Sequence, residues 1–170
     1  RLGRNLLAYH GCGSGEPLGI TEVRGAMFSR LLCFRHGLSG VSRELLGALT
    51  AFLNHGITPV VPARGSVGAS GDLTPCSYIA AALTGERDVW FRGSRVPARV
   101  ALAEAGLTPH SLRPKEALSL LNGTAVMTGI GIHVVEQARR LLEAATVATA
   151  LSLHALAAHV HHLSPILFEA

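Results

Sequence analysis

The sequence has few charged and few aromatic side chains. Charged residues make up 15% of its 170 positions and aromatic residues 5%, whereas apolar residues make up 48%. The low charge excludes an intrinsically disordered chain, because disorder requires the opposite balance of charge and hydrophobicity. The low aromatic content leaves few platforms on which nucleic-acid bases could stack. A globular chain that buries a sizeable core is therefore expected.

Cysteine is also scarce. The sequence contains only Cys12, Cys33 and Cys76, an odd number with no C-x-x-C spacing. This pattern excludes a disulfide framework or a zinc ribbon and favours a reducing compartment. No basic-then-apolar leader opens the sequence, so a cytoplasmic protein is expected.

Neither the charge nor the histidines form a clear ligand-binding cluster. The net charge of +4 comes from 15 basic and 11 acidic residues, and the arginines are scattered along the sequence. We interpret them as a solvated surface and expect no nucleic-acid partner. The histidines near the end have no carboxylate or thiol beside them until Glu169, so no metal site is predicted; they are His154, His159, His161 and His162.

Hydrophobic periodicity predicts a mainly α fold. One β signal stands out, because Asp88–Phe91 and Ser94–Val96 flank Arg92-Gly93 as a hairpin would. A short extended run is expected between Ile57 and Pro62, before a glycine-rich loop. Helices are predicted over residues 1–10, 21–37 with Thr21 as N-cap, 42–56 with Ser42 as N-cap, 72–83 and 100–105.

The segment from Lys115 to His162 contains no proline and predicts a long helix. From Asn122 to His162 such a helix would extend about 60 Å, more than a domain of this size accommodates. Residues 117–135 and 144–160 contain no Asp, Glu, Lys or Arg, so this surface must be buried. Interspersed Thr, Ser and His side chains favour the interior of a helical bundle over a membrane span. A second copy or further chain would supply the covering surface.

The densest chemical signal is Gly65-Ser66-Val67-Gly68-Ala69-Ser70-Gly71-Asp72. It lacks the Gly-Lys-Ser/Thr ending of a P-loop, and it is neither G-x-G-x-x-G nor a G-x-S-x-G nucleophile elbow. A purely structural alternative is that Asp72 or Ser70 caps the helix that follows.

In its wider context this loop resembles the signature of the aromatic amino-acid ammonia-lyases, which comprise histidine, phenylalanine and tyrosine ammonia-lyases and related aminomutases. The resemblance extends in order through most of the chain. One departure is Ala117, where the family pattern has glycine. The segments that carry the resemblance are residues 5–18, 54–62, 65–75 and 115–124.

The resemblance implies a cofactor made from the chain itself. The amide nitrogen of Gly71 would attack the carbonyl carbon of Ala69, and loss of two waters would turn Ser70 into an exocyclic methylene, giving 4-methylidene-imidazol-5-one (MIO) without a metal. Asp72 would assist ring formation and Asn122 would hold the imidazolone oxygen. A structural role for Asn122 as N-cap of the long helix remains open.

The resemblance also places Tyr9 and His10 in the substrate-ring pocket. A histidine there can hydrogen-bond an imidazole or a phenol, so it favours histidine or tyrosine over phenylalanine as substrate. Tyr9 departs from the smaller serine of histidine ammonia-lyases. A plain alternative is that His10 is a buried histidine with its polar atoms satisfied.

Together these observations predict non-oxidative deamination of an aromatic L-amino acid by a homotetramer. Residues 1–114 would belong to the MIO-bearing domain and residues 115–170 to the first long helix of a central bundle. The chain is expected to be a fragment, inactive alone, with the catalytic tyrosine upstream of Arg1 and further active-site residues downstream of Ala170. A 2,3-aminomutase and a catalytically silent helical scaffold are the alternatives.

Overall fold

The computed structural model describes residues 2–67 and 71–167. The chain divides into two compact units, one ending at His133 and the other beginning at Val134. In chain order the elements are α1 (Leu2–His10), β1 (Ser14–Pro17), α2 (Ile20–Phe34), α3 (Arg43–Asn54), β2 (Thr58–Pro59), β3 (Pro62–Arg64), α4 (Leu73–Leu83), β4 (Asp88–Phe91), β5 (Ser94–Pro97), α5 (Ala98–Glu104), α6 (Glu116–Leu121) and α7 (Ala125–Ala155), followed by the 3-10 turns η1 (Val160–Leu163) and η2 (Pro165–Leu167). The mainly α prediction is confirmed.

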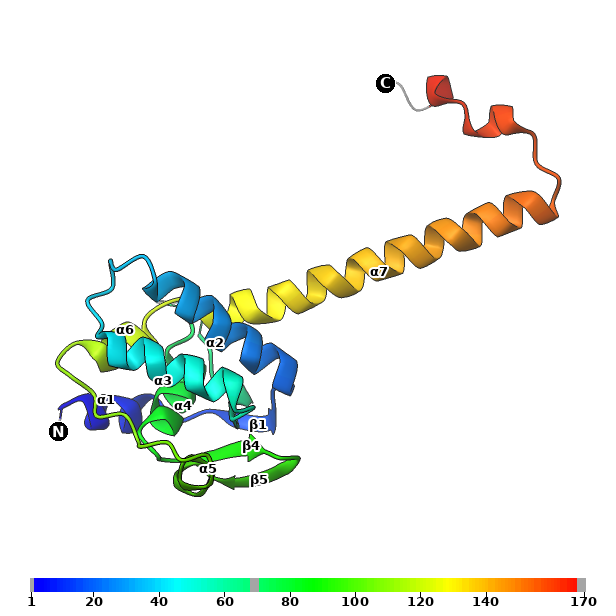
Figure 1. The fold of residues 1–170 in the computed structure, drawn as a ribbon. Helices are drawn as coiled ribbons and strands as arrows, with labels where there is room; N and C mark the ends of the chain where they lie inside the picture. The colour runs from blue at the N-terminus through cyan, green and yellow to red at the C-terminus, as the bar shows by residue number, and fades with distance from the viewer. Residues whose placement is uncertain (1, 68–70, 168–170) are drawn as a thin grey trace. The chain divides into compact units, whose positions relative to one another are not determined.

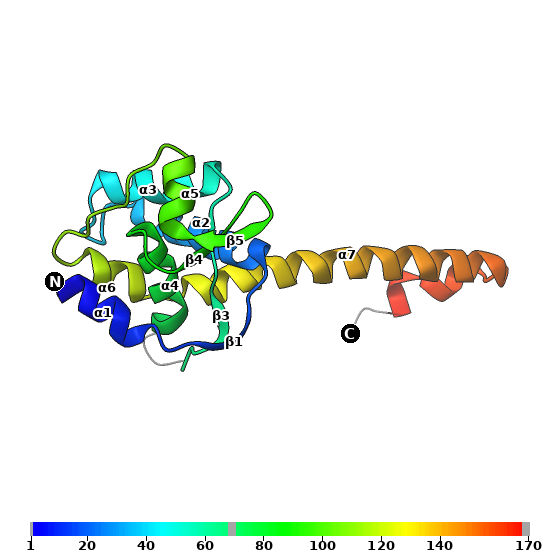
Figure 2. The same cartoon turned by 90° about the horizontal axis from the view of Figure 1, so that it is seen from below.

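Helix α4 is the centre of the first unit. It packs against both α1 and α6, which also contact each other (Figures 1 and 2). From Thr74 to Leu83 every residue of α4 is buried, so the helix that follows the glycine-rich loop is fixed on all sides. Leu7 of α1 and Leu121 of α6 are almost fully buried in the same core. The loop therefore leads into a rigid element.

The contact between α1 and α6 leaves room for Ala117, which stands where the family pattern has glycine. Ala117 is 4% exposed, and a Cβ added at Gly3 would lie 3.3 Å from its methyl group. The extra methyl on α6 therefore faces a residue on α1 that has no side chain. The two helices can pack closely without moving apart.

Helices α2 and α3 begin at different kinds of cap. The predicted cap at Ser42 is confirmed, since its hydroxyl accepts a hydrogen bond from the Leu45 N–H. The predicted cap at Thr21 is wrong, because α2 already begins at Ile20. There the backbone N–H of Gly19 donates to the Glu22 carboxylate over 2.7 Å, so a backbone group and the N3 carboxylate replace the hydroxyl cap.

Two small sheets complete the first unit. The predicted hairpin is confirmed as β4 and β5, with Trp90 opposite Arg95, and β2 pairs antiparallel with β4. The second sheet, in which Ser14 of β1 pairs with Arg64 of β3, was not predicted from the sequence. This pairing brings the segment after α1 beside the entry to the glycine-rich loop.

The long helix predicted from Asn122 to His162 is shorter. Helix α6 stops at Leu121, and α7 runs from Ala125 to Ala155. Ala157 has φ +50°; its N–H bonds to the His154 carbonyl, and the Ala158 N–H bonds to the Leu153 carbonyl. This is a Schellman closure with alanine in the left-handed position usually held by glycine.

The first turns of α7 cross α2 at glycine. A Cβ at Gly129 would overlap the backbone nitrogen of Ala26, and a Cβ at Gly25 would lie 3.1 Å from the Gly129 carbonyl oxygen. The two backbones touch because neither glycine carries a side chain. This contact fixes the start of α7 within the first unit.

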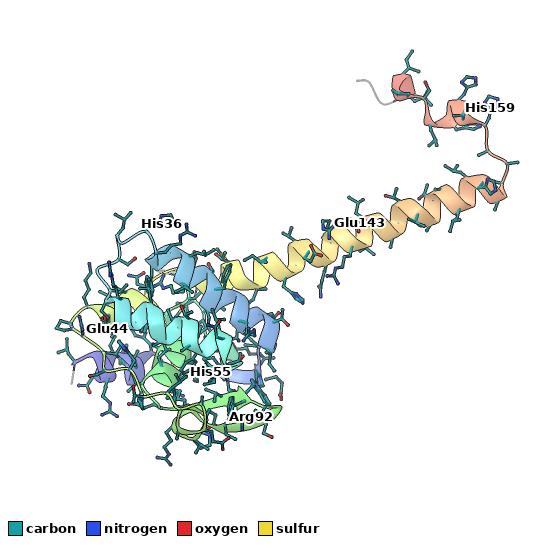
Figure 3. The ribbon with its side chains drawn as sticks, viewed as in Figure 1. His36, Glu44, His55, Arg92, Glu143 and His159 are labelled. Carbon is teal, nitrogen blue, oxygen red and sulfur yellow. The ribbon has the colours of Figure 1, made fainter. Side chains whose placement is uncertain are left out.

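Beyond His133 most of the side chains of α7 are exposed. Ion pairs along its surface join Arg139 to Glu136 and Glu143 (Figure 3 labels Glu143). Within the described residues, no helix is both long and apolar enough to span a membrane. The burial of this surface against other chains remains a prediction; its large apolar residues include Val134, Val135, Leu141, Leu142, Val147 and Leu151.

Candidate active site

Two glycines from distant parts of the chain meet at the end of the glycine-rich loop. Gly71 pairs with Gly123, and the Asp72 N–H donates to the Gly123 carbonyl over 2.9 Å. Gly71 has φ +75°, and a Cβ there would overlap the Gly123 carbonyl oxygen. Both the left-handed backbone and the close approach require glycine at position 71. Ala69 and Ser70, the other predicted cofactor residues, lie outside the described residues.

Asp72 connects this junction to a second helix. It is 5% exposed, and its Oδ2 accepts a hydrogen bond from the Met127 N–H over 2.9 Å, in the first turn of α7. Its Oδ1 accepts a hydrogen bond from the Ser66 hydroxyl over 3.4 Å. The interpretation of Asp72 as a side-chain cap of α4 is wrong, since its side chain makes no capping bond there. It caps α7 instead, where a carboxylate also complements the helix dipole.

Asn122 lies one residue before the glycine junction. The interpretation of Asn122 as N-cap of the long helix is wrong, because it ends α6 with an extended backbone and α7 begins three residues later. Its side chain is exposed in this chain. Its carbonyl oxygen accepts a hydrogen bond from Arg30 Nη2 over 2.6 Å. The predicted role of its amide toward the imidazolone remains a prediction.

A cavity of about 430 Å³ lies beside Gly71 and Asp72. Ser66 and Thr124 add hydroxyl groups to its wall. The rest of the lining is mostly apolar, so the cavity combines a few polar groups with a surface suited to a hydrophobic ring. The apolar lining residues include Leu18, Pro62, Pro75, Val126, Met127 and Ile130.

The structure does not bring Tyr9 and His10 to this cavity. They end α1, and their rings meet edge to face at 5.2 Å between centroids. Tyr9 is 80% exposed, His10 is half-buried, and neither lines the cavity beside Asp72. The plain alternative of a buried His10 is therefore not met, because the residue is half-buried, and its role toward a substrate remains a prediction.

The segment after His10 is nevertheless firmly held. The Tyr78 hydroxyl, on α4, lies 3.1 Å from the Gly11 carbonyl oxygen and 3.3 Å from that of Gly13. Arg87 also donates to the Gly11 carbonyl, and its guanidinium lies 4.1 Å from the centre of the Tyr78 ring. These contacts tie the segment that carries His10 to the helix that Asp72 begins.

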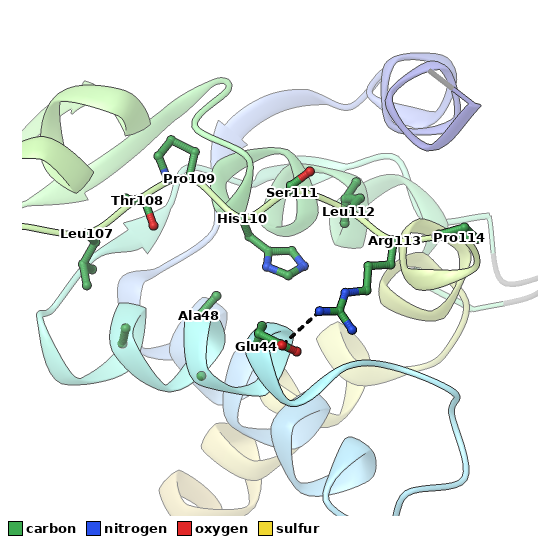
Figure 4. Close-up of a pocket in the computed structure, with 12 residues that line it drawn as sticks. Glu44, Ala48, Leu107, Thr108, Pro109, His110, Ser111, Leu112, Arg113 and Pro114 are labelled. Carbon is green, nitrogen blue, oxygen red and sulfur yellow. Dashed lines mark hydrogen bonds and ion pairs between the residues drawn. The ribbon is translucent and has the colours of Figure 1, made fainter.

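A second cavity, of about 680 Å³, lies between α3 and residues 107–114 (Figure 4). At its edge Arg113 pairs with Glu44 over 2.9 Å, with both side chains mostly exposed. The His110 ring points into the same region and bonds through Nε2 to Glu116. No described residue of the glycine junction lines this cavity, so it is separate from the candidate active site.

Glu116 is a buried carboxylate with a full set of donors. Burial alone raises its pKa, but hydrogen bonds from Ser42, Arg113 and His110 outweigh burial and lower the pKa to about 2. The carboxylate therefore stays ionised and joins the start of α3 to the start of α6. The sequence placed Glu116 in a family segment without predicting this structural role.

A role for Arg30 or Cys76 at this site was not predicted from the sequence. Burial lowers the pKa of Arg30, whereas the nearby Cys76, Cys33 and Asp72 raise it. Burial raises the pKa of the Cys76 thiol to about 12, so this thiol stays protonated. A signal for Arg30 was available in the sequence, because an arginine at a core-facing position of a helix must find acceptors.

These residues define a mainly helical domain in which Gly71 and Asp72, at the end of the glycine-rich segment, are held against a helix-to-helix turn beside an apolar cavity. The family model described as "Aromatic amino acid lyase" matches residues 1–170. The chain therefore belongs to the aromatic amino acid lyase family, as the sequence predicted.

Individual relatives support this family assignment. A histidine ammonia-lyase of Sorangium cellulosum is 46% identical over 155 residues, covering 91% of this chain and 30% of that protein. The crystal structure of histidine ammonia-lyase from Trypanosoma cruzi matches with a TM-score of 0.90 and 32% identity, over 98% of this chain and 33% of that one. The Pantoea agglomerans phenylalanine aminomutase matches with a TM-score of 0.86 and 32% identity, over 96% and 33%. The chain thus spans about a third of the length of these relatives.

Proposed function

We propose that the protein carrying this chain eliminates ammonia from an aromatic L-amino acid without oxidation, using an MIO electrophile built from Ala69, Ser70 and Gly71. The observation that carries the proposal is the junction of Gly71 with Gly123 beside a buried carboxylate, Asp72. Once formed, MIO supplies an electrophile that turns the substrate amine into a better leaving group.

The described residues fit such a group. Ring closure needs a residue after Ser70 whose nitrogen can approach a neighbouring carbonyl, and Gly71 has the left-handed backbone that only a residue without Cβ adopts easily. The hydrogen bond from Asp72 N–H to the Gly123 carbonyl fixes the exit of the tripeptide. The Asp72 carboxylate, held by Met127 and Ser66, is an acceptor for a proton released nearby.

The cavity favours a flat apolar group of the substrate. Its lining is mostly apolar, and among the described residues Ser66, Asp72, Thr124 and backbone groups bring polar atoms to it. Histidine, giving urocanate, is the first substrate to test, because a relative is named histidine ammonia-lyase. Tyrosine and phenylalanine, giving arylacrylates, follow.

Two measurements on the full-length protein test the proposal. The peptide that contains Ser70 is expected to lack the mass of two waters. Histidine, tyrosine and phenylalanine are then offered separately, and the absorbance of the unsaturated acid and the released ammonia are measured. A peptide of unmodified mass, or full turnover in the Ser70→Ala variant, would refute the mechanism.

A 2,3-aminomutase is the second candidate, favoured by the match to phenylalanine aminomutase. The two activities differ in their product: a lyase releases ammonia and the unsaturated acid, whereas an aminomutase returns the nitrogen as a β-amino acid. Chromatography of the same reactions distinguishes them. The same proposal includes a homotetramer, a cytoplasmic location and an isolated 170-residue chain that is inactive. Light scattering checks the homotetramer, and an activity assay of the purified chain checks its inactivity.

A further inference from the structure

We propose that Arg30 is a positioning residue that holds the Asn122–Gly123 turn in place, and through it Gly71 and Asp72, for formation of the electrophile. The inference rests on the proposed function for its chemical consequence. Its structural part, from Arg30 to the Asp72 backbone, can be tested without it.

Arg30 is a buried cation inside the first unit. It is only 9% exposed, on the inner side of α2, and its guanidinium lies 5.0 Å from the centre of the Phe34 ring. No carboxylate of the described residues forms an ion pair with it. Its Nε is buried and has no hydrogen-bond partner among the residues that the structure describes. Burying a charge costs free energy, so the hydrogen bonds that the guanidinium does make must offset this cost or serve a function.

Those bonds go to one short stretch of backbone. Nη2 donates to the carbonyls of Ser119 and Asn122, the latter over 2.6 Å. These carbonyls lie at the C-terminal end of α6, where backbone oxygens have no partner within the helix and a cation is favoured. Arg30 therefore fixes the point at which α6 ends and the turn to α7 begins.

The guanidinium also packs directly on the next residue. A Cβ at Gly123 would overlap Nη1 of Arg30, so the arginine lies against the glycine backbone. The carbonyl of the same Gly123 accepts the Asp72 N–H and touches Gly71. A continuous contact thus runs from Arg30 through Gly123 to the two residues that follow Ser70.

Charge adds to this contact. Burial lowers the pKa of Arg30, and Asp72, after Cys76 and Cys33, is one of the groups whose attraction for the cation offsets part of this effect. A neutral side chain at position 30 would lose both the bonds to the turn and this attraction. The turn would then relax, and the Gly123 carbonyl would no longer be fixed opposite the Asp72 N–H.

The test uses the full-length protein with Arg30→Met, Arg30→Lys and a matched control, Arg24→Met. Arg24 lies on the same helix and likewise donates to a backbone carbonyl, that of Leu53 at the end of α3, over 3.1 Å. Two quantities are measured: amide hydrogen exchange of the peptide that contains Asp72, and the fraction of Ser70 peptide that lacks two waters. Thermal unfolding shows that each variant is folded.

In Arg30→Met we expect exchange at Asp72 to become about tenfold faster and the dehydrated fraction to fall by a similar factor, since a hydrogen bond to a charged group is lost. Arg30→Lys keeps a charged donor, so we expect it to restore part of the slow exchange at Asp72 and part of the dehydrated fraction. This variant still tests the proposal if Arg30→Met does not fold. Arg24→Met changes exchange only near Leu53.

Each contrary result has its own meaning. Wild-type exchange at Asp72 in folded Arg30→Met and Arg30→Lys would overturn the positioning role. Faster exchange with an unchanged dehydrated fraction would overturn its link to the chemistry. A wild-type protein that never loses two waters would overturn the proposed function and the chemical part of this inference, while the exchange measurement would still decide the structural part.

Discussion

The carboxylate of Asp72, which begins α4, accepts the backbone N–H of Met127 in the first turn of α7, over 2.9 Å. One buried residue thus joins the starts of two helices that are far apart in sequence, since its backbone carbonyl accepts the Cys76 N–H of α4 while its side chain caps α7. The same residue donates its own N–H to the carbonyl of Gly123, in the turn between α6 and α7. Asp72 therefore has a structural role that is independent of any chemistry at Ser70.

The Asp72→Ala variant tests that role. Removing the carboxylate leaves the Met127 N–H without its cap, which is expected to cost about 1–2 kcal/mol of the free energy of unfolding. Denaturant unfolding of the full-length protein measures the loss. Asp88→Ala is the control: Asp88 pairs with Arg95 on the surface, so its loss should cost less than about 1 kcal/mol. Equal losses would contradict the capping role.

Gly71→Ala tests the close approach. Alanine at φ +75° costs about 1–2 kcal/mol for the backbone alone, and its Cβ would also overlap the Gly123 carbonyl oxygen. Gly93→Ala is a close match, because Gly93 has φ +79° but, its chain neighbours aside, no described residue lies within 4 Å of the new Cβ. We expect Gly71→Ala to lower the midpoint of thermal unfolding more than Gly93→Ala. If the two midpoints fall equally, the glycine contact is not tight.

The lowered pKa of Glu116 leads us to expect that the stability of the folded protein depends on pH. Its pKa in the folded protein is about 2, below the usual 4.5, so the folded state favours the ionised form. The resulting stabilisation is present above about pH 4.5 and is lost as the pH falls toward 2. The shift corresponds to about 3 kcal/mol.

Glu116→Gln should remove this part of the pH dependence between pH 5 and pH 2, as denaturant unfolding at several pH values would show. Glu104→Gln is the control, since Glu104 forms an exposed ion pair with Arg92. An unchanged pH dependence in Glu116→Gln would contradict the assigned pKa.

Tyr78→Phe tests the attachment of the segment after His10. The variant loses the hydroxyl that bonds to the Gly11 and Gly13 carbonyls, and the expected cost is about 1 kcal/mol in thermal unfolding. Tyr9→Phe is the stability control, because the Tyr9 side chain is 80% exposed. If His10 contacts the substrate ring, Tyr78→Phe also raises the KM for histidine more than it lowers kcat. A KM equal to wild type would argue that this attachment does not position the substrate.

Local sequence signals predicted much of the fold. The cap at Ser42, the hairpin turn at Arg92-Gly93 and the periodicity of α3 act within a few residues, and all three appear in the structure. The end of α7 was missed because it rests on Ala157 in a left-handed conformation that glycine, not alanine, normally signals. The pairing of β1 with β3 was missed because it joins two short polar segments without strand periodicity.

The candidate site was predicted by resemblance more than by geometry. The glycine-rich loop was identified from its residues, and Gly71 and Asp72 lie at a junction that is consistent with it. The partners were not predictable, since the contacts of Asp72 with Met127 and of Arg30 with Asn122 join residues far apart in sequence. Both are bonds to backbone groups, which the identity of the partner residue does not reveal.

The pairing of Gly71 with Gly123 has a consequence for timing during biosynthesis. The loop leaves the ribosome well before the residues that complete its surroundings, and a contact over such a sequence distance forms late. On the proposed chemistry, a nascent or misfolded chain would carry an ordinary serine and could not react with cellular amines. The reactive group would therefore form only after the chain has folded.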